Sequence, residues 1–226
     1  MSLKKIIRSL FIVACVLALM ISCSDMDDAF EKYVGDEAAM YLHKVDSVTV
    51  RAGRNRVKFD VYPNIDNRVL SYRVYYNYGQ DSVDVRVPKQ GEEFYSFVIE
   101  NLDEGVHSFN FVSQDEVRLK SLPKEFMAST YGDIYESQLS NRAIKSKLYE
   151  DNKLTLKWED TINEYGIKIT YTNVEGNTQV FEQFAPFSES VVENIDGNEV
   201  IQYQTIFRPE ELACDLFFSD SIIIDL

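Results

Sequence analysis

The chain has 226 residues, a length that suits two domains of about 100 residues each. Its 45% hydrophobic share is too high for a disordered or low-complexity polymer. Acidic residues outnumber basic ones by 37 to 23, whereas a protein that binds nucleic acid needs a basic surface for the phosphates. Length, composition and charge therefore predict a folded protein of two domains that does not bind nucleic acid.

Residues 1–22 have the features of a secretory signal peptide. Three basic residues provide a positive start, and an apolar run of twelve residues extends from Leu10 to Ile21. A helix that spans a membrane needs about 20 residues, so this run is too short to be one. We expect the segment to direct export and then to be removed.

The end of this segment, Met20-Ile21-Ser22-Cys23, resembles a bacterial lipobox, in which the cysteine is acylated and becomes the first residue. The resemblance implies lipidation at Cys23 and attachment to the outer membrane. Each methylene of an acyl chain that the membrane buries adds about 0.8 kcal/mol to such an anchor. An ordinary secretory signal followed by an unrelated cysteine is the alternative.

An acidic tether follows the signal peptide and is expected to extend over residues 23–44. Its first residues resemble the surface-export signal of Bacteroidota-type lipoproteins, and those that carry the resemblance are Ser24, Asp25, Asp27 and Asp28. The resemblance implies that the protein faces the cell exterior. A solvated acidic linker without a role in export is the alternative.

Cys214 is the only free thiol expected in the mature chain, because Cys15 lies in the signal peptide and Cys23 would carry lipid. No disulfide within the chain is therefore expected, and Cys214 should act as a small hydrophobic residue in a strand. The mature chain carries 20 basic and 37 acidic side chains, and the resulting net charge of −17 favours solubility.

Beyond the tether, apolar residues alternate with polar ones, which is the pattern of half-buried strands. Val57, Phe59 and Val61 form one such set. Two further sets follow after turn-forming residues, namely Tyr72, Val74 and Tyr76, and then Val83, Val85 and Val87. Short strands at this spacing predict an antiparallel β-sandwich.

Three short patterns recur in the same order later in the chain. Residues 55–59, 72–76 and 98–103 resemble residues 152–158, 167–171 and 191–196, at offsets of 97, 95 and 93 residues. The repeats predict two copies of one sandwich module, at residues 45–128 and 145–226. Residues 129–144 are then the connector.

The repeated residues resemble the fibronectin type III pattern. Leu154-x-Leu156-x-Trp158 resembles its second strand, and Leu102-Asp103-Glu104-Gly105 followed by Phe109 resembles the turn into its sixth strand. The resemblance implies an all-β protein with two tandem fibronectin type III-like, immunoglobulin-like antiparallel sandwiches. Because Trp158 alternates with core residues, we expect it to be buried.

Five segments that lie far apart in the mature chain are Gly53-Arg54-Asn55-Arg56, Asn101-Leu102-Asp103-Glu104-Gly105, Tyr131-Gly132-x-x-Tyr135, Leu139-x-Asn141-Arg142, and Phe207-Arg208-Pro209-Glu210 followed by Asp215-x-Phe217. Together with Cys23 and its tether, they resemble an uncharacterised family of Bacteroidota-type surface lipoproteins. Members of that family resemble accessory lipoproteins of Sus-like glycan-utilisation systems. The resemblance implies contact with glycan or with a Sus-like transporter complex.

The sequence offers no recognisable catalytic constellation, metal site or cofactor motif. His43 and His107 stand in separate contexts, and no HExxH, Gly-x-Ser-x-Gly or phosphate-loop motif is present. Adjacent carboxylates, which glycoside hydrolases use, occur at Glu92-Glu93, Asp103-Glu104 and Glu210-Glu211. Such pairs in turn-like segments are mostly solvated charges, so we predict that the protein is not an enzyme. A carboxylate-based hydrolase is the minor alternative.

Exposed aromatic residues are the remaining candidates for a ligand site, because sugar rings stack on tyrosine faces. Strand alternation places Tyr75 beside Arg73 on the face that points away from the core, with Tyr78 in the next turn. Tyr131 and Tyr135 lie in the connector, where clefts between domains form. The structural alternative is that these tyrosines cover sheet edges or the contact between domains.

These observations predict a non-catalytic outer-membrane surface lipoprotein that binds polysaccharide or oligosaccharide, or that assists a Sus-like transporter complex in glycan uptake. A structural or adhesive adapter that presents a protein-binding surface is the alternative. No cofactor and no metal ion are expected.

Overall fold

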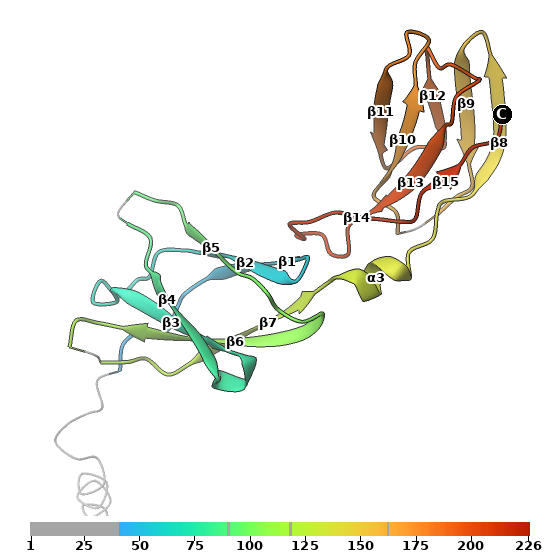
Figure 1. Cartoon of the computed structure of the whole chain (residues 1–226). Helices are drawn as coiled ribbons and strands as arrows, with labels where there is room; N and C mark the ends of the chain where they lie inside the picture. The colour runs from blue at the N-terminus through green and yellow to red at the C-terminus, as the bar shows by residue number, and fades with distance from the viewer. Residues whose placement is uncertain (1–40, 90, 118, 162) are drawn as a thin grey trace, which may run out of the picture. The chain divides into compact units, whose positions relative to one another are not determined.

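The computed structural model describes residues 41–226 except Gln90, Arg118 and Ile162 (Figure 1). The predicted lipidation and export residues, Cys23, Ser24, Asp25, Asp27 and Asp28, lie outside the described residues. Every named pair of strands is antiparallel. Within the described part of the chain, no helix is long and apolar enough to cross a membrane. The predicted all-β fold class is confirmed.

The first sandwich consists of a three-stranded and a four-stranded sheet, in the orders β1-β2-β5 and β4-β3-β6-β7. Its strands are β1 (Val48–Gly53), β2 (Arg56–Val61), β3 (Ser71–Tyr76), β4 (Asp81–Arg86), β5 (Tyr95–Ile99), β6 (Gly105–Gln114) and β7 (Lys124–Thr130). A short 3-10 helix, η1 (Asn77–Gly79), joins β3 to β4. The alternating sets predicted from the sequence fall on β2, β3 and, apart from Val87, β4.

The second sandwich repeats this plan, with the orders β12-β9-β8 and β11-β10-β13-β14, and with β15 also paired to β13. Its strands are β8 (Ile144–Glu150), β9 (Lys153–Trp158), β10 (Gly166–Thr172), β11 (Thr178–Phe184), β12 (Glu189–Val192), β13 (Gln202–Phe207), β14 (Phe217–Phe218) and β15 (Ile222–Ile223). In the chain between β7 and β8 lies the short helix α3 (Asp133–Ser137).

Each sandwich has a hydrophobic core of its own. On β2, Val57, Phe59 and Val61 are fully buried in the first core, as the alternation predicts. In the second core Trp158 is 3% exposed, which confirms its predicted burial. Its indole N–H donates to Oγ of Ser190 at 2.8 Å, so the polar group of this ring is also satisfied. Because the two cores are separate, we expect each sandwich to be stable by itself.

The internal repeat appears as equivalent backbone hydrogen bonds in the two sandwiches. Asn55 and Asn152 both adopt the left-handed conformation, with φ of 49° and 59°, at the turn before β2 and β9. The carbonyl of Asn55 accepts from the backbone N–H of Leu102 at 3.0 Å, and that of Asn152 accepts from Ile195 at 2.9 Å. The repeated sequence patterns therefore mark the same positions of one module, which confirms the predicted repeat.

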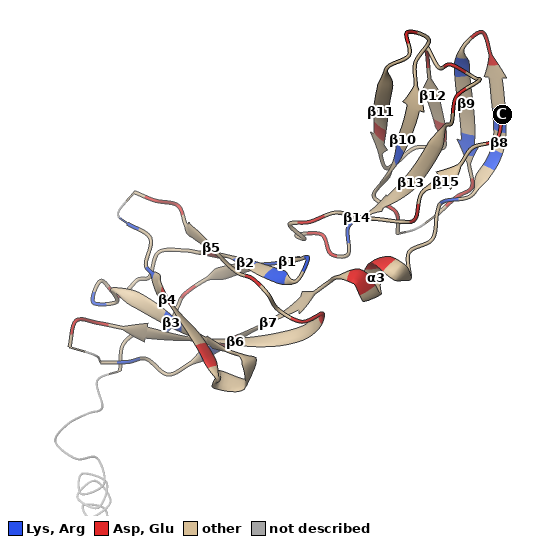
Figure 2. Ribbon diagram, in the orientation of Figure 1, with Lys and Arg blue, Asp and Glu red and all other residues tan. Residues whose placement is uncertain are grey.

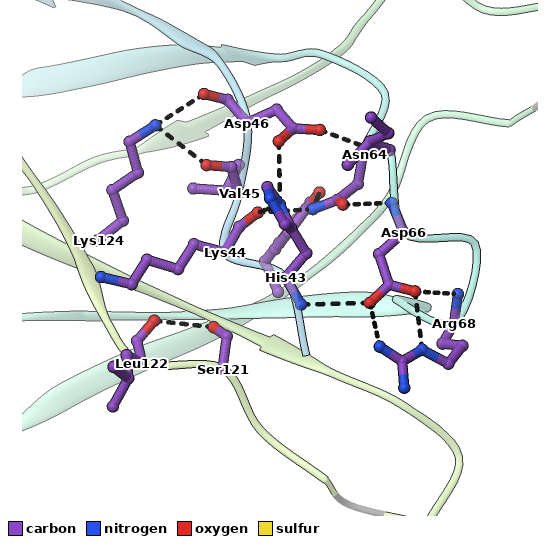
Figure 3. A network of polar contacts seen from close by, with 12 residues as sticks. His43, Lys44, Val45, Asp46, Asn64, Asp66, Arg68, Ser121, Leu122 and Lys124 are labelled. Carbon is purple, nitrogen blue, oxygen red and sulfur yellow. Dashed lines mark hydrogen bonds and ion pairs between the residues drawn. The ribbon is translucent and has the colours of Figure 1, made fainter. Parts of the chain in front are cut away.

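The chain enters the first core before the predicted start of the module at residue 45, because Leu42 is already 3% exposed and packs in that core. A polar network fixes this entry (Figure 3). The carboxylate of Asp66, in the loop between β2 and β3, accepts from the backbone N–H of His43 at 3.2 Å. From β7, Nζ of Lys124 donates to two backbone carbonyls of the same entry segment.

The prediction that Cys214 lies in a strand as a small hydrophobic residue is wrong. Cys214 is exposed and lies in a bend between β13 and β14. Its backbone N–H donates to the carbonyl of Ala52 in β1 at 2.8 Å. The segment is thus held by a contact with the first sandwich rather than by pairing within a sheet.

Candidate functional site

Tyr75 and Arg73 lie on the outer face of the sheet β4-β3-β6-β7, where strand alternation places them. Register pairs Tyr75 with Ser82 on one side and Asn110 on the other. Arg73 forms a two-pronged hydrogen bond with Asp84, with distances of 2.7 and 2.6 Å. Tyr75 is half-buried, so its ring is available only in part.

Tyr78 is fully exposed at the tip of the β3–β4 connection. Its φ of 55° lies in the left-handed region, as do the φ values of its neighbours Asn77 and Gly79. Bulky residues rarely adopt this conformation, and strain of this kind costs about 1 to 3 kcal/mol and gathers at functional sites. Among the described residues, no ring contact joins Tyr78 to Tyr75.

The other predicted pair, Tyr131 and Tyr135, belongs to a packed aromatic cluster. Their ring centroids are 4.8 Å apart, and both rings pack edge-on against Phe217, at 6.0 and 5.2 Å. The hydroxyl of Tyr131 donates to Glu210 at 2.9 Å, and burial raises the pKa of Tyr131 to about 12. These two tyrosines therefore take part in the contact between α3 and the β13–β14 segment, which was the structural alternative for them.

Asp215 is the centre of the ion pairs beside this cluster. Its carboxylate accepts from Nε and a terminal nitrogen of Arg56 at 2.9 and 2.5 Å, and from the backbone N–H of Arg54 at 2.8 Å. The hydrogen bond from Arg56 lowers the pKa of Asp215 in spite of its partial burial. An ionised carboxylate with three donors therefore attaches the β13–β14 segment to the turn between β1 and β2.

Arg54 joins that turn to helix α3. Its guanidinium donates to Glu136 at 2.7 Å and lies over the ring of Phe217, 4.7 Å from the centroid. Figure 2 shows the complementary charges, with acidic residues on α3 and basic residues at the turn between β1 and β2. The end of β1 and the β13–β14 segment approach each other closely, because a Cβ atom on Gly53 would lie 2.5 Å from the carboxylate of Asp215.

Glu104 fixes the start of α3 from the first sandwich. Its two carboxylate oxygens accept from the backbone N–H groups of Ile134 and Tyr135, at 2.9 and 2.6 Å. The first turn of a helix leaves such N–H groups without partners, so a carboxylate there satisfies them. Connector, first sandwich and β13–β14 segment thus meet in one contact region, the junction, which is made by Arg54, Arg56, Glu104, Tyr131, Tyr135, Glu136, Asp215 and Phe217.

The junction gathers segments that are far apart in the sequence. Four of the five segments on which the resemblance to the lipoprotein family rests contribute to the junction, namely those within residues 53–56, 101–105, 131–135 and 207–217. The pairing of Arg56 with Asp215 was not predicted, and their separation in the chain explains why. The motifs signalled that these residues matter, but only the fold brings them together.

One member of each carboxylate pair considered for hydrolysis has a structural partner. Glu92 pairs with Arg86 at 2.7 Å, Glu104 caps α3, and Glu210 accepts from Tyr131. No group of three or more histidine, cysteine, aspartate and glutamate side chains is placed to hold a metal ion in the described part of the chain. These acids have structural partners, which weakens the hydrolase alternative.

We expect Arg56→Ala to loosen the β13–β14 segment, because the partly exposed pair with Asp215 contributes about 1 kcal/mol, or a factor of about five in local opening. Cleavage by a glutamate-specific protease at Glu210 and Glu211 should accelerate by that factor. Arg73→Ala is the matched control, since it removes an equally two-pronged pair outside the junction. Equal cleavage rates in the two variants would contradict the assignment.

Comparison with known proteins places the chain in a family. Among solved structures, it is similar to the FN1–FN3 domains of chicken CNTN1, at 12% identity and a TM-score of 0.46, over 80% of this chain and 64% of that one. It is also similar to a two-domain fibronectin type III segment of chicken tenascin, at 15% identity and a TM-score of 0.32, over 80% and 97% of the two chains. The chain therefore spans less than two thirds of the CNTN1 segment. No curated protein matches it. The model of the family DUF4998, described as a domain of unknown function, matches residues 23–217, and the chain belongs to this family.

Proposed function

We propose that the protein is a non-catalytic adapter, anchored by lipid at the outer surface of the outer membrane, whose two sandwiches act as one unit. The observation that carries the proposal is the junction. A flexible linker between two sandwiches can consist of short polar residues alone. The ion pairs, the aromatic packing and the helix cap of the junction would then have no role. A linked pair can present a partner at a set distance from its anchor.

The anchor is proposed at Cys23. The lipobox-like residues before it, and Ser24 with the acidic residues Asp25, Asp27 and Asp28 after it, support a surface lipoprotein. The same resemblance makes a Sus-like transporter complex the protein partner that we propose.

Cys23→Ala should abolish incorporation of radiolabelled fatty acid and release the protein from the membrane fraction, because the acylated thiol is then missing. Cys214→Ala is the matched control and should keep both label and membrane location, since Cys214 lies in the folded part of the chain. Labelling that persists in Cys23→Ala would refute the anchor. Protease treatment of intact cells, which should degrade the wild-type protein, tests the outward orientation.

A second candidate function is glycan binding by the first sandwich, and the exposed, left-handed Tyr78, three residues after the half-buried Tyr75, favours it. Each stacked ring would contribute about 1 kcal/mol. The resulting weak affinity suits a protein displayed at high density, where multivalency compensates.

Tyr75→Ala and Tyr78→Ala should each weaken oligosaccharide binding about fivefold in isothermal titration, without a change in melting temperature. Phe184→Ala, which removes an aromatic ring that is 48% exposed on β11 of the second sandwich, is the control. Loss of binding only together with unfolding would favour the adapter without a glycan site.

A further inference from the structure

A groove of about 540 Å³ lies where α3 meets the outer face of the sheet β11-β10-β13-β14. This α3 groove is lined on the helix side by Asp133 and Glu136, and on the sheet side by Lys168, Gln204, Phe218 and Asp220. Its volume falls in the range of about 300 to 1,000 Å³ that is usual for small-molecule sites.

Strand register explains why these side chains share one face. Lys168 on β10 pairs with Gln204 on β13, and paired residues of antiparallel strands project to the same side. The neighbours of Lys168 in the chain, Ile167 and Ile169, are fully buried, so Lys168 itself points away from the core. The outward face of a sheet therefore forms the floor of the groove.

The polar groups of the groove have spare hydrogen-bonding capacity. Nζ of Lys168 lies 5.3 Å from the centroid of the Phe218 ring, and no hydrogen bond or ion pair to it occurs in the described part of the chain. The Asp133 side chain is 98% exposed and only touches Arg54, at 3.3 Å. Gln204 donates through Nε2 to the carbonyl of Ser219, which leaves its Oε1 free to accept. The lining thus combines one cationic donor, several acceptors and an aromatic ring.

This combination selects a class of ligand. Three carboxylates against one lysine in the lining disfavour an anion, and the polar majority of the lining disfavours an apolar molecule. A polyhydroxylated ligand can donate to the carboxylates and to Gln204, accept from Lys168, and place its apolar C–H patch on Phe218. We propose that the α3 groove is a binding site for a short, uncharged oligosaccharide.

The inference rests on the glycan arm of the proposed function but puts the ligand on the second sandwich rather than on Tyr75 and Tyr78. The two locations call for different variants. The adapter proposal depends on neither.

The test is isothermal titration of the full-length chain in detergent with neutral tetrasaccharides of glucose, mannose and xylose. Lys168→Ala and the double variant Asp133→Ala/Asp220→Ala should each weaken binding about tenfold, since each removes hydrogen bonds to the ligand. Lys147→Ala and Asp160→Ala remove exposed charges elsewhere on the second sandwich and should change affinity less than twofold. Circular dichroism melting should show all four proteins folded.

Binding that the groove variants weaken, and that Tyr75→Ala leaves unchanged, supports the inference. Binding that only Tyr75→Ala or Tyr78→Ala weakens overturns it and leaves the glycan function standing on the first sandwich. Absence of heat with every tetrasaccharide overturns both. Binding of trilysine that high salt removes, without binding of any sugar, overturns the inference in favour of a cationic partner.

Discussion

Phe59→Ala is expected to destabilise the first sandwich by about 3 to 5 kcal/mol, the cost of truncating a buried phenylalanine. Phe59 is fully buried at the centre of an aromatic cluster, with ring centroids 5.0 Å from Phe97, 4.9 Å from Phe109 and 5.6 Å from Phe111. Its loss removes contacts from both sheets at once. For a domain of this size, that is a large part of the total stability.

The single tryptophan of the chain allows the two sandwiches to be followed separately. Trp158 lies in the second core, so its fluorescence reports the unfolding of the second sandwich only. In Phe59→Ala, circular dichroism should show that the first sandwich unfolds at a much lower denaturant concentration than in the wild-type protein. The midpoint of the tryptophan fluorescence should fall only by the amount of stability that the second sandwich loses with the junction. This shift of the fluorescence midpoint measures how strongly the junction couples the stabilities of the two sandwiches.

Leu156→Ala is the matched control in the second core, where Leu156 is fully buried. It should lower the fluorescence midpoint and leave the first sandwich folded. A fluorescence midpoint that falls equally in Phe59→Ala and Leu156→Ala would show that the two cores unfold as one, against the view that each sandwich is stable by itself.

The strands could be predicted because their signal is local. Alternation on β2 and β3 depends on neighbours two residues apart, and burial on one face of a sheet imposes it directly. The internal repeat was also visible, because the turn residues Asn55 and Asn152 hold the same left-handed position in each copy. Fold class and burial of Trp158 follow from such short-range information.

The junction could not be predicted because its information is long-range. Arg56 and Asp215 carry no pattern that pairs them, and 159 positions separate them in the chain. The segment around Cys214 has no alternation to reveal its contact with β1, so the prediction of a strand there was wrong. Tyr131 and Tyr135 illustrate the same limit, since their sequence context allowed both a ligand cleft and a packed contact.

The α3 groove went unseen for a related reason. Lys168 and Gln204 read as ordinary polar residues of amphipathic strands, and only the pairing of β10 with β13 makes them neighbours. Asp133 comes from another element altogether. A site assembled from α3 and two strands has no motif of its own in the sequence.

Arg51→Leu is expected to destabilise the first sandwich by about 3 kcal/mol, because the buried charge of Asp60 then keeps only Ser96 and the more distant Lys58, at 4.0 Å, as partners. Asp60 is 2% exposed, and its carboxylate accepts from Nε of Arg51 at 2.7 Å and from the hydroxyl of Ser96 at 2.5 Å. Burial alone would raise the pKa of Asp60, but the hydrogen bonds from Ser96 and Arg51 outweigh it and hold the pKa below its ordinary value of 3.8. Removal of Arg51 takes away its hydrogen bond and its charge, which both lower this pKa, so the pKa of Asp60 should rise.

The pH dependence gives the sign of the effect. In the wild-type protein a lowered pKa means that the stability contributed by Asp60 is present above pH 3.8 and is lost as pH falls through the pKa of the folded state. In Arg51→Leu the pKa of Asp60 should be higher than in the wild-type protein, so the deficit relative to wild type should be largest at neutral pH and should shrink on acidification. Urea unfolding monitored by circular dichroism at several pH values measures both curves.

The double variant Arg51→Leu/Asp60→Asn decides whether the buried charge is the cause. Asparagine keeps the shape and can still accept from Ser96, but it has no charge to leave unpaired. We expect the double variant to be more stable than Arg51→Leu at neutral pH and to lose its pH dependence. If Asp60→Asn instead adds its own cost to that of Arg51→Leu, the two side chains act independently and Arg51 stabilises β1 and β2 only by packing.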